Sequence, residues 1–513
     1  MAPITGNALV DFLIGRPVTM NQDAPVTKID NVWYGGFFIQ DDWCVRPRLT
    51  LNLGLRYDLQ TPATDPHDRK LTFLRGVQSQ VVPSAPVGLL FPGDASVGRG
   101  IISADKNNFA PRVGLAWDPL GDAKTSIRAA FGVFYGGISG NEWNATAENQ
   151  PFTIRLRFNN VKSLTDPYGL LPGGVSPYPY SYTPSAPRFV FPASILGPSL
   201  DFRWPYIYQM NFSVQRQVRN DLSLEAAYVS SLAHKLPFQR DLNYPIYGPG
   251  ATTGNVNSRR PILPGTLAVI SELNSIMNTA YHGLQLTADK RMSRNFQFKA
   301  FYTFSKSLEG ARMQNDTTAG GAQNMNDLRA ERGRTDNDRR HNFVCSLVWQ
   351  TAYFRNIRLA HHLLDGWTVS AITTFRSGAP FTVTNGTDRN LDGNTNDRAD
   401  LVGQPRPDPN RPRSDATAKW FDPAAFAITP LGQDGTSGRN FLDEPGRRNV
   451  DVAVFRDFSL HERFRLQFRT EMTNAFNLAN LSGPTSNLNS SAVGQIRTAA
   501  GMREVQLGLR IRF

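Results

Sequence analysis

The sequence has no long apolar run. No window approaches 18 uninterrupted apolar residues, which excludes membrane-spanning helices. The mean hydropathy is −0.36 and 40% of the residues are hydrophobic, values typical of a soluble protein. Strands that cross a membrane escape this test, because half of each strand is polar. Composition therefore leaves a soluble β protein and a membrane-spanning sheet both open, and the 11% aromatic content suits either.

The sequence also lacks the residue clusters of most catalytic and metal centres. Its two cysteines, Cys44 and Cys345, lie far apart and belong to no Cys-x-x-Cys or Cys/His cluster, so no zinc site is predicted. No Ser/His/Asp set and no paired carboxylates stand out. We therefore predict that the protein is not an enzyme and that it requires no cofactor.

A signal peptide is missing as well. Residues 1–10 contain no basic stretch followed by an apolar segment. A protein exported to an outer membrane needs such a signal. We therefore expect the chain to be a fragment of a longer protein, or to start from a misplaced initiation site.

Positive charge is in excess but is not gathered in one place. The formal net charge is +12, from 55 Lys and Arg against 43 Asp and Glu. A nucleic-acid-binding surface needs clustered charge, so no nucleic-acid partner is predicted. The densest charged run, 329–340, mixes both signs. It fits either a contact with an anionic solute or a salt-bridge network that holds a loop, and we favour the network.

Alternation of apolar and polar residues is the strongest pattern that is present. Val505, Leu507, Leu509, Ile511 and Phe513 alternate with polar residues and a glycine, which places the apolar side chains on one face of a strand. Twelve earlier segments alternate in the same way and form six hairpins. The predicted hairpins pair 32–44 with 49–56, 110–118 with 125–136, 206–218 with 222–230, 281–291 with 295–305, 342–350 with 366–376, and 450–458 with 463–474.

The connections between these strands alternate between short and long. Tight turns such as 46–48 close the hairpins, and long stretches such as 60–108, 137–205 and 377–449 join one hairpin to the next. Outer-membrane barrels have short periplasmic turns and long extracellular loops. We therefore predict an all-β fold: a partial antiparallel transmembrane β-barrel of about 13 or more strands with long extracellular loops. Residues 1–31 form a lead-in segment of a preceding loop, and 32–513 form the C-terminal portion of the barrel.

The connections also predict strand direction. The last strand follows a long loop, so it runs from outside to the periplasm and places Phe513 at the periplasmic rim. The first strand, 32–44, precedes a short turn and also runs inward, whereas a barrel chain that starts in the periplasm begins with an outward strand. We therefore expect at least one earlier strand to be missing and residues 503–513 to have one unpaired edge.

Motifs in these strands resemble TonB-dependent outer-membrane receptors. Phe38-Ile-Gln-Asp-Asp-Trp43 and Arg48-Leu-Thr-Leu-Asn-Leu-Gly-Leu-Arg-Tyr-Asp58 are similar to one hairpin of that family. Asn108-Phe-Ala-Pro-Arg-Val-Gly-Leu-Ala-Trp-Asp118 is similar to the next. The motifs that resemble the Oar-like branch are Gly6-Asn-Ala-Leu-Val-Asp-Phe-Leu-Ile-Gly15, Tyr302-Thr-Phe-Ser-Lys-Ser307, Asp338-Arg-Arg-His-Asn-Phe343 and Asn474-Ala-Phe-Asn477. The ordered series spans nearly the whole chain and is more specific than any single motif.

The resemblance implies a gated transporter that takes up scarce, bulky solutes across the bacterial outer membrane. The implied partners are outer-membrane lipid, the barrel-assembly machinery that reads the terminal Phe513, the TonB complex through a missing N-terminal region, and an unidentified solute. No TonB box, plug or regulatory-like domain is found, so the chain is expected to be a truncated barrel part. The alternatives are a structural or adhesive outer-membrane barrel without transport activity and a soluble multi-domain β protein such as a propeller.

One predicted loop has the spacing of a calcium-binding loop. Oxygen-bearing side chains occupy alternate positions around Gly393, as in an EF-hand-type loop. The candidate metal ligands are Asp388, Asn390, Asp392, Asn394 and Asn396. The bidentate glutamate of that motif is absent, because Ala399 stands at its position. A polar extracellular turn explains the same residues, because Asp and Asn tolerate turn conformations.

Tryptophans lie near the ends of the predicted strands. The five are Trp33, Trp43, Trp117, Trp349 and Trp367. Anchoring at a membrane interface explains this placement better than carbohydrate stacking.

Overall fold

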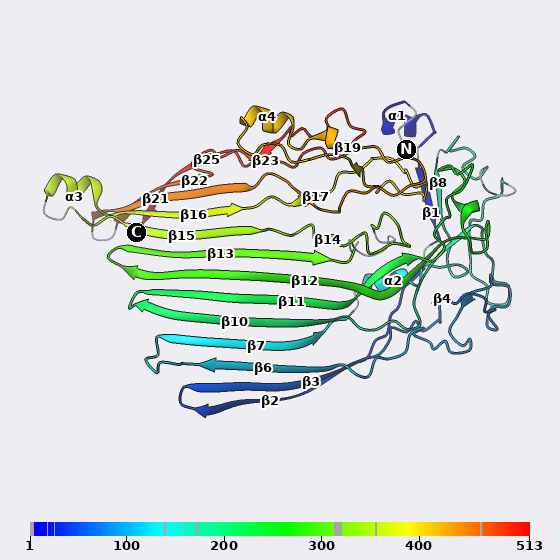
Figure 1. Ribbon diagram of the computed structural model, residues 1–513, viewed down its shortest axis with the longest axis horizontal. Helices are drawn as coiled ribbons and strands as arrows, with labels where there is room; N and C mark the ends of the chain where they lie inside the picture. The colour runs from blue at the N-terminus through cyan, green and yellow to red at the C-terminus, as the bar shows by residue number, and fades with distance from the viewer. Residues whose placement is uncertain are drawn as a thin grey trace.

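The fold is nearly all β. The computed structural model describes residues 5–513 except 18, 25, 138–139, 160, 170, 172–173, 312–320, 354–356 and 462–463. A 15-stranded sheet contains a continuous antiparallel path of 13 strands, each bonded to the next along the chain (Figure 1). These strands are β2 (Tyr34–Arg46), β3 (Leu49–Gln60), β6 (Phe109–Trp117), β7 (Thr125–Tyr135), β10 (Tyr206–Arg219), β11 (Leu222–Asp241), β12 (Leu267–Ser293), β13 (Phe296–Glu309), β15 (His341–Gln350), β16 (Trp367–Arg376), β21 (Arg447–His461), β22 (Phe464–Thr473) and β25 (Glu504–Arg512). The 13 predicted strands are confirmed.

The remaining elements are short and lie in the connections. The other strands are β1 (Thr19–Asp23), β4 (Thr72–Phe73), β5 (Leu89–Leu90), β8 (Arg155–Asn159), β9 (Ala193–Pro198), β14 (Gly333–Arg334), β17 (Pro380–Phe381), β18 (Asp400–Leu401), β19 (Phe426–Ala427), β20 (Leu442–Asp443), β23 (Asn480–Leu481) and β24 (Ala499–Ala500). The helices are α1 (Ala8–Leu13), α2 (Gly140–Ala145), α3 (Arg358–Leu364) and α4 (Arg413–Ala418), with 3₁₀ turns η2 (Asn257–Arg259) and η3 (Pro423–Ala425). Among the described residues, no helix has the length and apolar character needed to cross a membrane.

Short turns lie at one end of the sheet and long connections at the other (Figure 1). The turn between β12 and β13 shows why the short ones close tightly. Arg294 and Asn295 have φ values of 50° and 63°, and Ser293 pairs directly with Phe296. A two-residue turn with left-handed φ at both positions matches the twist of the paired strands. The C-terminus lies at this short-turn end, as predicted for Phe513.

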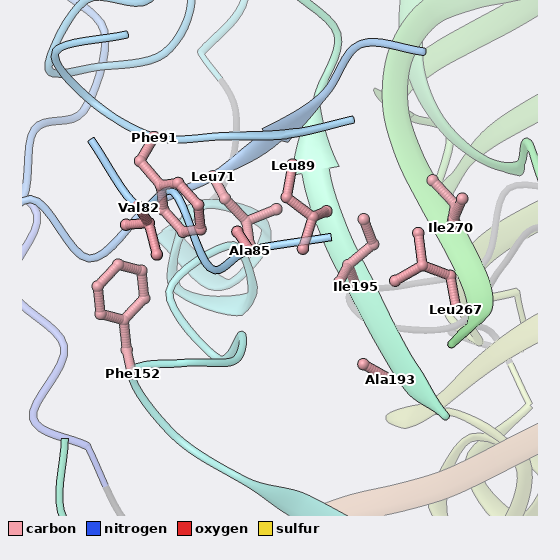
Figure 2. Close-up of a cluster of buried hydrophobic side chains, with 10 residues drawn as sticks. All are labelled: Leu71, Val82, Ala85, Leu89, Phe91, Phe152, Ala193, Ile195, Leu267 and Ile270. Carbon is pink, nitrogen blue, oxygen red and sulfur yellow. The ribbon is translucent and has the colours of Figure 1, made fainter. Parts of the chain in front are cut away.

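The described residues of the long connections fold into a layer that we call the loop cap. These connections are 61–108, 136–205, 242–266, 310–340, 377–446 and 474–503. The largest apolar cluster of the loop cap joins the first two of these connections, the second of which includes β9, to β12 (Figure 2). The buried members are Leu71, Val82, Ala85, Leu89, Phe91, Phe152, Ala193, Ile195, Leu267 and Ile270. A separate cluster around Val383 and Phe421 packs the connection 377–446. The loops therefore have cores of their own.

One predicted loop boundary is wrong. The predicted hairpins that end at 230 and begin at 281 leave residues 231–280 as a long loop between them, yet β11 continues to Asp241 and β12 begins at Leu267. The end of β11 and the start of β12 pair with each other beyond the predicted strands, and β9 runs parallel to this part of β12. Leu267, Ile270 and Leu273 are buried there, so both faces of this extension are partly covered.

The path of 13 strands is open. Within the described residues, β2 pairs only with β3 and β25 only with β22. The predicted unpaired edge of residues 503–513 is confirmed. The lead-in segment 1–31 contains α1 and β1, and β1 pairs with β8 of the loop cap.

Candidate functional site

One face of the sheet is apolar from edge to edge. Strand register places Val113, Phe131 and Met210 side by side, and Phe298 beside Leu347 in the same way. Further members are Leu53, Ile127, Phe212, Leu224, Leu284, Leu286, Phe375, Val454, Phe468, Leu507 and Leu509. Asp41 of the edge strand β2 is an acidic exception. A soluble monomer rarely exposes an apolar patch of more than a few hundred Å², so this face is built to contact lipid.

Different aromatic residues mark the two ends of this apolar face. Trp43, Trp117, Trp349 and Trp367 all lie at the short-turn end. Tyrosines paired with histidines lie toward the loop end. The Tyr228 hydroxyl lies 2.7 Å from Nδ1 of His282, and the Tyr302 hydroxyl lies 2.7 Å from Nδ1 of His341. Trp33 precedes β2 at the loop end. Amphipathic rings at both boundaries are the arrangement expected of a membrane-spanning sheet.

The opposite face is mostly polar and carries a cavity of about 590 Å³. Gly54, Gly114 and Gly132 form part of its floor, and the Arg112 guanidinium lies 4.5 Å from the centre of the Phe134 ring. A Cβ at Gly132 would lie 2.8 Å from that ring. Small residues therefore keep this part of the polar face open, beside a cation and an aromatic ring that suit a polar solute or a docked protein segment.

Ion pairs and hydrogen bonds of arginines tie distant connections of the loop cap together. Arg398 pairs with Glu331, and the Arg439 guanidinium donates to the backbone carbonyl of Glu331 at 2.8 Å. Arg334, in the charged run 329–340, pairs with Asp443 at 2.6 Å. These contacts support the salt-bridge interpretation of that run, because its carboxylates and guanidinium groups face other loops.

The Asp/Asn loop folds around its own backbone. Oδ1 and Oδ2 of Asp388 accept from the backbone amides of Asp392 and Gly393 at 3.1 and 2.9 Å, and Oδ1 of Asp392 accepts from that of Asn394 at 2.7 Å. Gly393 has a φ of 98°, which a residue with a Cβ adopts only under strain. The side-chain amide of Asn390 donates to Tyr244 from another connection and to Asp434 from a later part of its own connection.

Two acceptor atoms at the end of this loop are buried without partners. They are the side-chain oxygen of Asn396 and Oδ1 of Asp397, within the described residues. Asp397 is fully buried, and its other oxygen accepts from the backbone amides of Arg389 and Asn390. Burial, together with the nearby charges of Asp392 and Asp388, raises the pKa of Asp397 to about 7. A buried carboxylate with raised pKa favours either a proton or a cation.

The five predicted ligands do not all converge. Asn394 is exposed and donates its side-chain amide to Asp392, and Asn396 donates to the backbone of Ala322. In the part of the chain that the structure describes, no group of three or more His, Cys, Asp or Glu side chains is arranged to hold a metal. In the sequence, Asp397 stands near the position of the missing glutamate but is not one of the five predicted ligands, and Tyr244 is not indicated at all. Tyr244 carries no local signal, because it comes from a different connection.

The terminal Phe513 lies on the apolar face and is 94% exposed. Its ring centre lies 6.5 Å from that of Phe464 at the start of β22. Cys44 and Cys345 are both free thiols on different strands.

Comparison with known families gives one clear match. Residues 2–506 match the model of the outer membrane beta barrel domain. No curated protein is significantly similar to the chain in sequence.

Several solved outer-membrane proteins are similar in fold at low identity. The outer membrane transporter YddB from Escherichia coli matches with a TM-score of 0.48 and 10% identity, over 94% of this chain and 45% of that one. The FrpB iron transporter from Neisseria meningitidis matches with a TM-score of 0.42 and 11% identity, over 93% and 45%. The ferripyoverdine receptor of Pseudomonas aeruginosa matches with a TM-score of 0.41 and 9% identity, over 94% and 39%. The chain spans less than half the length of each of these proteins.

Proposed function

The chain belongs to the family of outer membrane β-barrel domains, and from this we propose that it is the barrel part of a TonB-dependent transporter for bulky solutes. Family membership places the protein in the bacterial outer membrane and excludes a soluble propeller. The observation that carries the proposal is the two-faced sheet. Its apolar face suits lipid, and its polar face holds the 590 Å³ cavity beside Arg112 and Phe134.

Two further features support transport over a purely structural role. The ordered motifs from Phe38 to Asn477 resemble TonB-dependent receptors of the Oar-like branch. The polar face also presents arginines from neighbouring strands. In the register of β22 and β25, Arg465 lies opposite Arg512, and Gln467 lies opposite Arg510. A polar face with positive charges on adjacent strands suits either a docked plug domain or an anionic solute.

The first test is the natural coding sequence ahead of residue 1. A plug domain and a TonB box encoded there are the expected result. Their absence would favour the structural or adhesive outer-membrane barrel instead.

The second test measures uptake. The parent strain should remove certain bulky solutes from a defined medium. A strain without the gene and a strain without TonB should both leave those solutes behind, as measured by mass spectrometry of the spent medium. Equal depletion by both deletion strains and the parent strain would contradict transport.

We also propose that the loop 388–400 binds calcium. The supporting observation is the pair of unpartnered acceptor atoms on Asn396 and Asp397, beside the buried carboxylate of Asp392. Burial raises the pKa of Asp392 as well. Among the described residues, neither Asp392 nor Asp397 forms an ion pair, so a hard cation with oxygen ligands would offset their charge. Isothermal titration of the chain with calcium should show heat at millimolar concentration or below, and no heat would end this proposal.

A further inference from the structure

A second cavity lies where the apolar face meets the loop cap. Its volume is about 630 Å³. Lys306 and Leu308 of β13 and His341 of β15 line it from the sheet. Register places Phe304 opposite His341 and Lys306 opposite His282, on the same face as Tyr302. The cavity therefore lies at the loop-end boundary of the membrane, beside the belt of tyrosine and histidine.

The lining of this cavity is rich in cations. Its basic residues are Lys306, Arg334, Arg340, His341, Arg406 and Arg439. Carboxylates offset two of them, because Arg334 pairs with Asp443 at 2.6 Å and Arg439 pairs with Glu309 at 2.7 Å. Lys306 and Arg340 form no ion pair within the described residues. The Arg406 guanidinium donates to the backbone carbonyl of Phe441 at 2.5 Å. The cavity therefore keeps a surplus of positive charge.

The cationic groups sit directly above apolar surface. The Arg340 guanidinium lies 5.4 Å from the centre of the Phe304 ring, and Phe304 is 41% exposed on the apolar face. Lys306 is exposed on the same face. A ligand that carries an anionic head and apolar chains would match both surfaces at once, because arginine and lysine bind phosphate oxygens and the aromatic rings below contact hydrocarbon.

We propose that this cavity binds the phosphate group of a negatively charged membrane lipid in the leaflet on the loop side, through Lys306 and Arg340. Free phosphate offers the same head-group chemistry without the chains. Position favours the lipid, because Lys306 and Phe304 alternate with polar-face residues and lie on the lipid-contacting side. Arg334 and Arg439 stabilise the wall of the cavity instead, since both are already paired with carboxylates.

The experiment uses the full chain, extracted from the outer membrane in dodecyl maltoside. Native mass spectrometry measures how much diphosphoryl lipid A remains bound during a titration. The double variant Lys306→Gln/Arg340→Gln should bind at least about tenfold more weakly, because even one lost charged hydrogen bond is worth about that factor. The matched control is Arg216→Gln/Arg456→Gln, which removes two charges from the same face at the short-turn end. The control should bind like the unmodified chain.

Two further arms need no variant. Lipid A from which both phosphates have been removed should bind about tenfold more weakly to the unmodified chain. Inorganic phosphate at millimolar concentration should leave the diphosphoryl lipid bound. Equal binding of the phosphorylated and dephosphorylated lipids, or equal loss in both double variants, would overturn the proposal. Displacement of the lipid by inorganic phosphate would overturn its assignment to a lipid.

Discussion

Arg439 and Glu309 form a salt bridge 2.7 Å long although 130 residues separate them in the sequence. Glu309 is the last residue of β13, and Arg439 belongs to the connection 377–446. Both side chains are nearly buried, with 6% and 10% of their surface exposed. This pair therefore joins a strand that contacts the membrane to the loop cap above it.

Glu309→Gln should destabilise the loop cap. The substitution keeps the shape of the side chain and leaves the buried Arg439 without its carboxylate, which costs about 3–5 kcal/mol for a buried pair. Protease cleavage within 377–446 and unfolding in urea, in detergent, measure the effect. The matched control is Asp68→Asn, since the exposed pair of Arg99 and Asp68 should contribute less than about 1 kcal/mol. Equal stability of the two variants would contradict this role.

Leu286→Arg should prevent stable insertion into a membrane. Leu286 lies on the apolar face in the middle of β12, opposite Tyr302. Arginine on the lipid face costs about 2–4 kcal/mol near the bilayer centre. Heat-modifiable migration on gels, after refolding into lipid vesicles, reports the folded fraction. Its neighbour Thr287 lies on the polar face, so Thr287→Arg should fold like the unmodified chain. Folding of both variants to the same extent would mean that the two faces are assigned wrongly.

The strand pattern was readable from the sequence wherever one face meets lipid. Phe296 to Phe304 alternate except at Phe301, because the membrane and the polar face impose opposite demands on successive residues. The pattern fails where the sheet leaves that boundary. Residues 267–277 are covered on both faces by the loop cap, and bulges near Leu236 and Pro237 break the partner strand. The sequence alone therefore ends β11 too early and starts β12 too late.

The candidate sites were predictable only in part. The spacing from Asp388 identified the acidic loop, because local hydrogen bonds within a turn depend on neighbouring residues. Tyr244 joins it from a different connection, and Asp434 from 44 residues further along the same connection. The charged run 329–340 was visible, whereas its partner Asp443 and the unpaired Lys306 were not, because ion pairs between loops depend on how the loops pack.

Asp397 should make stability fall as pH rises when calcium is absent, and calcium should offset that fall. Its pKa is about 7 in the folded protein and near 3.8 when unfolded, so the folded state binds more protons between these values. Without calcium, stability should therefore fall as pH rises from about 4 to about 7, by on the order of 4 kcal/mol for this group alone. Calcium displaces the proton, so its stabilising effect should grow over the same range.

Urea unfolding with calcium or with chelator, at pH 5 and pH 8, measures both effects. Asp397→Asn should remove this part of the pH dependence and weaken the calcium effect. Asp408→Asn is the control, because Asp408 is an acidic residue in an exposed part of the same connection. A calcium effect that is the same at both pH values would show that Asp397 is not a ligand.

Phe513→Ala should impair assembly in the cell more than folding in vitro. The terminal ring is almost fully exposed and contacts Phe464, so its packing contributes little to the finished sheet. If the assembly machinery reads the terminal aromatic residue, its loss should lower the amount of heat-modifiable protein in the outer membrane and leave refolding in detergent unchanged. Phe464→Ala removes the same ring contact but keeps the terminus, so it separates the two roles. Equal assembly defects in the two variants would assign the effect to ring packing, and normal assembly of Phe513→Ala would remove the terminal residue from the signal.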